Sequence, residues 1–279
     1  MFAAFTDLTI DRNGAFILLW LTMLGGIIGS FLNVVVYRLP AGKSLLFPGS
    51  QCPQCHHAIR CYNNLPVLGW FLLGGKCRDC QAPIGARYPA VEALTAIIFL
   101  TVALTHVVLP LPDHTTDVDR YWLVLKTEFG RFLYLVTLLC GLEVAALIRY
   151  DGHRLPRSLV WFLVLLGFIA PLLWPNVRAS GDRADLGMSL MLGAAVGVAA
   201  AMFVTLAVRW LDKSSGVAIE VGTVLVSVGI FLGTRMVANV ALVATVIFLL
   251  AALVSRRRLP WIVYASVFTC LAVALGFSL

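Results

Sequence analysis

Residues 14–37 read GAFILLWLTMLGGIIGSFLNVVVY, a run of 24 residues without a charged side chain. A helix needs about 20 consecutive apolar residues to cross the hydrocarbon core of a bilayer. Of the 279 residues of the chain, 60% are hydrophobic and 13% are charged. Runs such as 159–173 and 240–254 are apolar on nearly every side, unlike the alternating strands of a membrane barrel. We therefore predict an all-α integral membrane protein.

Apolar runs of similar length recur along the chain. We expect about eight crossings, at 14–37, 89–110, 130–148, 158–175, 186–208, 217–234, 236–254 and 260–278. These runs divide the chain into a first transmembrane helix (1–39), a soluble lobe (40–88) and a transmembrane helical domain (89–279). The first run follows Asp7, Asp11 and Arg12 rather than a basic segment, so we expect no cleavable signal peptide.

The distribution of basic residues predicts the orientation. The net charge is +7, which would suggest nucleic acid as a partner if the protein were soluble. Here the basic residues stand mostly at the ends of apolar runs, so we expect no nucleic-acid partner. With the N-terminus outside, 14 of the 21 lysines and arginines fall on inner segments. The positive-inside rule then places the lobe in the cytoplasm.

The lobe contains two C-x-x-C pairs separated by 21 residues, Cys52 with Cys55 and Cys77 with Cys80. Each pair can turn two thiolates toward one tetrahedral centre. Four thiolates suit zinc and leave no open position for catalysis, so we predict a structural, zinc-ribbon-like site.

Other readings of the cysteines remain open. Two disulfides would require an oxidising compartment, which disagrees with a cytoplasmic lobe. An iron–sulfur cluster also takes four thiolates, but paired short knuckles are more typical of zinc ribbons. Cys61, His56 and His57 lie close by and are interpreted as surface or packing residues first and as spare ligands second.

Several segments resemble the bacterial type IV prepilin leader peptidases. The run GSFLNVVVYRLP at 29–40 is similar to their opening signature, and LPVLGW at 65–70, PI at 83–84 and RYPAVE at 87–92 match in order and spacing. The resemblance implies a bifunctional enzyme of the bacterial inner membrane. Such enzymes cut the leader of type IV prepilins or type II secretion pseudopilins and then methylate the new N-terminus with S-adenosylmethionine.

The resemblance also implies an aspartic peptidase, which requires two carboxylates that share a proton. The first aspartate of the family follows an isoleucine and precedes a proline by seven residues, where this chain has Arg149. The second belongs to a G-x-G-D motif, whose best match puts Val221 at the aspartate position. We therefore expect peptidase activity to be lost, with Asp151 and Glu220 as weaker candidates for a displaced pair.

Three hypotheses for function follow. The first is a family enzyme that acts on prepilins and retains methyl transfer. The second is a non-catalytic membrane protein that binds pilins as an assembly factor or regulator. The third, a transporter or channel, is supported by the helix count alone.

Overall fold

The computed structural model describes residues 12–109 and 118–174, together with position 195. Its described residues form two compact units. One consists of residues 12–34 with 44–109 and 118–125, and the other of residues 35–43 with 126–174.

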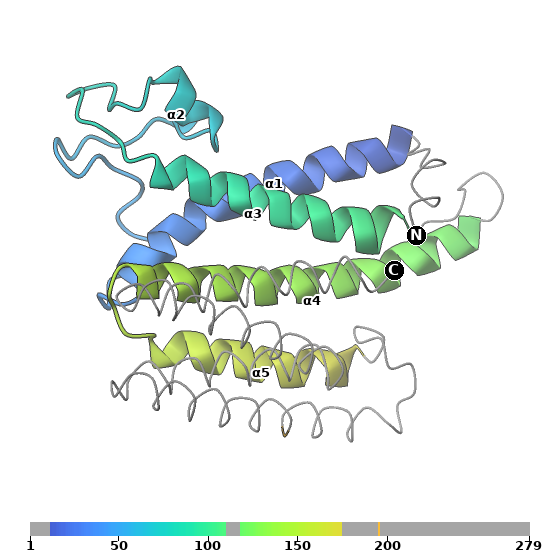
Figure 1. The fold of residues 1–279 in the computed structure, drawn as a ribbon. Helices are drawn as coiled ribbons and strands as arrows, with labels where there is room; N and C mark the ends of the chain where they lie inside the picture. Colours follow the sequence, from blue (N-terminus) through green and yellow to red (C-terminus); the bar gives the residue numbers. More distant parts are fainter. Residues whose placement is uncertain (1–11, 110–117, 175–194, 196–279) are drawn as a thin grey trace, which may run out of the picture. The chain divides into compact units, whose positions relative to one another are not determined.

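Helices account for most of the described chain (Figure 1). They are α1 (Arg12–Arg38), η2 (Cys61–Asn63), α2 (Leu68–Leu72), α3 (Arg87–Ala103), η3 (Leu104–Val108), α4 (Val118–Tyr150) and α5 (Arg157–Leu173). Three segments are long and apolar enough to cross a membrane, namely Arg12–Arg38, Arg87–Val108 and Trp122–Tyr150. The predicted helical membrane fold is therefore confirmed in this part of the chain. The crossings expected at 186–208, 217–234, 236–254 and 260–278 lie outside the described residues, so the total of eight stays a prediction.

The boundaries agree with the predicted spans except at the start of α4. This helix was expected over 130–148 but already begins at Val118. Its first turns carry charged residues, namely Asp119, Arg120, Lys126 and Glu128, which interrupt the apolar run but do not prevent helix formation. A pair between Arg131 and Glu128, with 2.8 Å from nitrogen to oxygen, joins neighbouring turns there.

In the first unit, α1 and α3 approach closely at two glycines. A Cβ added to Gly25 would lie 2.7 Å from Cβ of Phe99, and one added to Gly29 would lie 2.8 Å from Cα of Glu92. Two glycines four residues apart let helix backbones come together in membranes, where packing replaces the hydrophobic effect. Farther along, the Asn33 side-chain amide donates to the carbonyl of Tyr88 at 3.2 Å.

In the second unit, α4 and α5 lie side by side (Figure 1). Gly141 of α4 leaves room for the side chain of Leu163, since a Cβ there would come within 2.5 Å of a Leu163 methyl group. The Tyr134 hydroxyl donates to the carbonyl of Gly167 at 3.1 Å. A short turn joins the helices, which places them antiparallel.

The close approach of α1 and α3 predicts the effect of filling it. Gly29→Ala would push a methyl group against the backbone of Glu92, and overpacking of this kind costs about 1–3 kcal/mol. We expect a lower apparent Tm in lipid nanodiscs, measured by thermal unfolding. Gly85→Ala is the matched control, because nothing lies within 4 Å of a Cβ at that position. Equal melting of the two variants would contradict the close packing.

Candidate metal centre and the loop after α4

The two C-x-x-C knuckles of the lobe have the same backbone geometry. The N–H of Cys52 donates to the carbonyl of His57 at 3.0 Å, and the N–H of Cys77 donates to the carbonyl of Ala82 at 2.8 Å. Both bonds reach five residues along the chain. In the second knuckle the Cys77 carbonyl accepts from the N–H of Gln81 at 3.0 Å. In the first knuckle the Cys52 carbonyl accepts from the N–H of His56 at 2.9 Å.

A left-handed residue closes each knuckle. His56 and Gln81 both have φ of 59°, a conformation that non-glycine residues seldom adopt. Isolated antiparallel bridges, Gln51 with Ala58 and Lys76 with Pro83, flank the two turns. The lobe thus contains the same turn twice, 25 residues apart in the sequence.

The knuckles bring the four predicted ligands together. The sulfurs of Cys52, Cys55, Cys77 and Cys80 all lie within 4.8 Å of one another. Across the knuckles, Cys52 Sγ is 3.8 Å from Cys80 Sγ, and Cys55 Sγ is 4.0 Å from Cys77 Sγ. A tetrahedral centre with metal–sulfur bonds of about 2.3 Å has sulfurs about 3.8 Å apart. The spacing fits a bound metal ion and is far longer than a disulfide of about 2 Å.

The thiols do not ionise alike without a cation. Backbone N–H groups of Cys55 and then Gln54 lower the pKa of Cys52 to about 6. For Cys55 the backbone N–H of His57 acts in the same direction, but desolvation and the neighbouring thiols outweigh it and raise the pKa to about 12. A divalent ion would supply the positive charge that four adjacent thiolates need.

Two of the residues interpreted as spare ligands, His56 and His57, stay outside this cluster. Both are exposed. Tyr62 instead links the two halves of the lobe, because its hydroxyl accepts from Nη1 of Arg60 and of Arg78, each at 3.0 Å. Tyr62 has no signal in the sequence, because an arginine pair around a tyrosine leaves no periodic pattern.

The lobe is fastened to α3 through Glu92. The Glu92 carboxylate accepts from the backbone N–H of Val67 at 2.6 Å. Hydrogen bonds to an ionised group are stronger than neutral ones. This contact gives the Glu92 carboxylate a structural role within an apolar helix, where carboxylates are otherwise unfavourable.

Comparisons with known proteins place this arrangement in a family. The family model described as the bacterial peptidase A24 N-terminal domain matches residues 23–106, which hold the C-terminal part of α1, the lobe and α3. A type 4 prepilin-like proteins leader peptide-processing enzyme of Escherichia coli is 32% identical over 261 residues, covering 85% of this chain and 84% of that protein. The chain belongs to the prepilin leader peptidase family.

Other prepilin leader peptidase/N-methyltransferases are similar over shorter stretches. That of Myxococcus xanthus is 35% identical over 153 residues, which cover 50% of this chain and 44% of that protein. That of Pseudomonas aeruginosa is 35% identical over 171 residues, which cover 53% and 52%. No solved structure matches the chain. The resemblance found in the sequence is confirmed at the level of the family.

The loop after α4 is the place where the sequence predicts the first aspartate position of prepilin leader peptidases. Gly152 has φ of 80°, its N–H donates to the carbonyl of Arg149 at 2.9 Å, and the N–H of His153 donates to the carbonyl of Ile148 at 3.1 Å. These bonds form a Schellman motif, which satisfies the last carbonyls of the helix. The Arg149 guanidinium donates to the carbonyl of His153 at 3.1 Å.

The candidate pair of displaced carboxylates is only partly described. Asp151 is exposed at the end of α4, with its N–H bonded to the carbonyl of Leu147 at 3.0 Å. Glu220 and Val221 lie outside the described residues. An approach of Asp151 to Glu220 therefore stays a prediction.

The metal site predicts that each chain binds one metal ion. Cys77→Ser removes one of four thiolates, so we expect metal content measured by elemental analysis to fall well below one ion per chain. Cys140→Ser is the control, because Cys140 is a free cysteine of α4 outside the cluster. Lowering the pH should release the ion, since protons compete for the thiolates. Equal metal content in both variants would contradict the site.

The loop after α4 predicts a stability effect for Arg149. A cation at a helix C-terminus is favourable and an anion is unfavourable, so Arg149→Asp should lower stability by about 1–2 kcal/mol. The measurement is the apparent Tm of the purified protein. Arg154→Asp, in the exposed loop, makes the same charge change beyond the helix end and should cost less. A stabilising effect of Arg149→Asp would contradict this account.

Proposed function

We propose that this chain acts on type IV prepilins or type II secretion pseudopilins in the bacterial inner membrane and does not cut their leaders. Family membership supports the substrate class, because the relatives are named as prepilin leader peptidase/N-methyltransferases. In this proposal the lobe faces the cytoplasm, as the positive-inside rule predicts. The N-terminal part of the chain, of which residues 23–106 match the family model, retains methyl transfer with S-adenosylmethionine.

The observation that carries the proposed loss of cleavage is Arg149. An aspartic peptidase needs one carboxylate to accept a proton from water and a second to polarise the scissile carbonyl. A guanidinium stays protonated in proteins and accepts no hydrogen bond. Arg149 donates to the backbone of its own loop, which is the role of a helix-capping residue. With Val221 at the second position, neither half of the proposed dyad is acidic.

We propose zinc as the ion of the four-cysteine site. Sulfur ligands in a tetrahedron favour zinc among the common divalent ions, and four cysteines leave no open coordination position. Cys52, Cys55, Cys77 and Cys80 would hold it. Its contribution would be to the folding of the lobe. We also propose that the N-terminal part of the chain binds S-adenosylmethionine, and we assign no individual residues to that site.

A second candidate is a non-catalytic protein that binds pilins as an assembly factor or regulator. The combination of a well-formed lobe with Arg149 and Val221 favours it, because a peptide can be bound without proton transfer. The two candidates differ in methyl transfer alone, which makes that activity the discriminating measurement.

Leader cleavage is the first test. Metal-loaded protein in nanodiscs is mixed with a prepilin, and we expect binding without a shortened product on mass spectrometry, because the dyad lacks both carboxylates. A cleaving member of the family serves as the positive control. Leader removal that Asp151→Asn or Glu220→Gln abolishes would overturn the proposed loss of cleavage.

Methyl transfer is the second test. An already processed pilin is incubated with labelled S-adenosylmethionine and the protein, and we expect label at the pilin N-terminus. Cys77→Ser should reduce the label because the lobe loses its metal, whereas Cys140→Ser should not. Absence of transfer by folded, metal-loaded protein would eliminate the first candidate and leave the binding protein.

A further inference from the structure

The short helix α2 has an apolar face that the lobe leaves uncovered. Leu68, Phe71 and Leu72 are 62%, 66% and 76% exposed. Three adjacent, largely exposed apolar side chains on one short helix are unusual for a surface in water. The neighbouring Leu65 is 47% exposed and extends the same segment. We call residues 65–72 the apolar wedge.

The opposite side of the apolar wedge is held firmly by the lobe. Gly69 is buried, and a Cβ added there would collide with the carbonyl of Asn63. The Trp70 indole donates to the carbonyl of Ile84 at 2.9 Å, and its ring covers Gly75. Since Ile84 and Gly75 flank the second knuckle, the metal centre fixes which face of α2 points outward.

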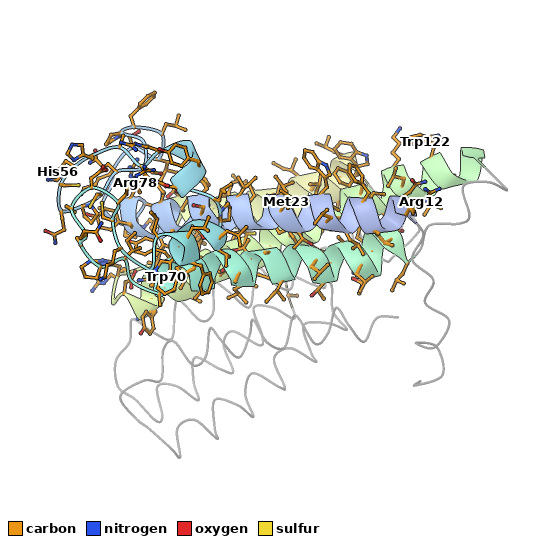
Figure 2. The ribbon with its side chains drawn as sticks, turned by 90° about the horizontal axis from the view of Figure 1, so that it is seen from above. Arg12, Met23, His56, Trp70, Arg78 and Trp122 are labelled. Atoms are coloured by element: carbon orange, nitrogen blue, oxygen red, sulfur yellow. The ribbon has the colours of Figure 1, made fainter. Side chains whose placement is uncertain are left out.

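The apolar wedge lies beside the membrane helices rather than beyond their ends. Pro66 packs on Gly26 of α1, where an added Cβ would be 3.1 Å from the Pro66 ring. Gly26 stands twelve residues, or about 18 Å, before the end of α1. Glu92, which binds Val67, stands five residues, or about 8 Å, into α3. Figure 2 shows Trp70 near the first turns of α3.

A stripe of α1 also carries exposed apolar side chains. Met23, Ile27 and Phe31 are 60%, 55% and 43% exposed on a helix long and apolar enough to cross a membrane. Met23 stands one turn before Gly26, on the side of the helix where Pro66 packs. Exposed apolar side chains are therefore present both on α2 and on the helix that Pro66 contacts.

Hydrogen bonds hold the backbone turn at the start of the wedge, which lowers the cost of placing that turn in an apolar environment. Val67 has φ of 62° and ψ of −55°, and around it the N–H of Leu68 donates to the carbonyl of Pro66 at 2.6 Å. This is a γ-turn, a strained conformation for a β-branched residue. The N–H of Gly69 donates to the carbonyl of Leu65 at 2.8 Å. The N–H of Val67 itself donates to the Glu92 carboxylate.

The charge of the lobe suits an anionic lipid surface. Residues 40–88 contain five basic residues and one acidic residue, a net charge of +4 with neutral cysteines. With four thiolates around one divalent ion the lobe still carries +2. Basic groups next to a membrane are attracted to acidic lipid headgroups. Apolar side chains on a short helix, with basic groups around them, are the pattern of an interfacial anchor.

We propose that the apolar wedge is inserted into the lipid headgroup and upper acyl region, and that it anchors the metal lobe to the bilayer. The depth expected for such an anchor is about 5–10 Å. The partner is the lipid itself. A second copy of the chain or a pilin segment on the same residues would be a different occupant.

Photo-crosslinking tests the proposal on the full, metal-loaded chain in nanodiscs of phosphatidylcholine and phosphatidylglycerol. Benzoylphenylalanine is placed at Phe71 or Leu72, with Met23 as the lipid-facing control and His57 as the exposed lobe control. Intact mass after irradiation identifies the adduct. Metal content measured on each variant verifies that the lobe is folded.

Lipid adducts at Phe71 and Leu72, at a yield close to that of Met23 and several-fold above that of His57, support the anchor. Yields at Phe71 and Leu72 equal to that of His57 overturn it. Adducts with a second chain, or with a prepilin added to the sample, overturn it as well. A further variant, Leu72→Glu, should increase hydrogen exchange across residues 65–72, while His57→Glu should not; equal exchange in both variants contradicts lipid insertion.

Discussion

Four cysteine sulfurs within 4.8 Å of one another are the contact on which the lobe depends. Between 40 and 88 the structure has one helical turn at η2 and the five residues of α2, so few apolar side chains are available to form a core. A bound ion would supply that core, because its binding free energy becomes folding free energy. The two knuckles, with the same bonds 25 residues apart, position four thiolates in the way such a centre requires.

From the four-cysteine cluster, a series of contacts leads to α3 and α1. Ile84 and Gly75 beside the second knuckle hold Trp70, and Trp70 belongs to α2. Residue Val67, just before α2, is bound by Glu92 of α3. The same turn of α3 packs on Gly29 of α1. A change at the cysteines would therefore reach the helices through the lobe backbone and not through a flexible linker.

The sequence predicted the cysteine cluster and the helices better than it predicted the contacts between them. The spacing of Cys52, Cys55, Cys77 and Cys80 predicts that cluster because a knuckle is local and its geometry follows from two residues between thiols. Glu92 binding to Val67 depends on residues 25 apart, and on a γ-turn that no local pattern predicts. Gly25 and Gly29 do carry a signal, four-residue spacing of small residues, which hydropathy alone overlooks. The early start of α4 was missed because apolarity was used to place helix ends.

Under the proposed assignment of Arg149 to the first aspartate position, a catalytic position has become a structural one. A carboxylate at a helix C-terminus opposes the helix dipole, so it is stable there only when a proton or a partner compensates its charge. In a peptidase the second aspartate shares that proton. Under the proposal that Val221 stands at the second position, the compensation is gone and an aspartate at 149 would be destabilising. An arginine at the same position favours the dipole and bonds to the His153 carbonyl. Loss of one carboxylate therefore favours replacement of the other by a cation.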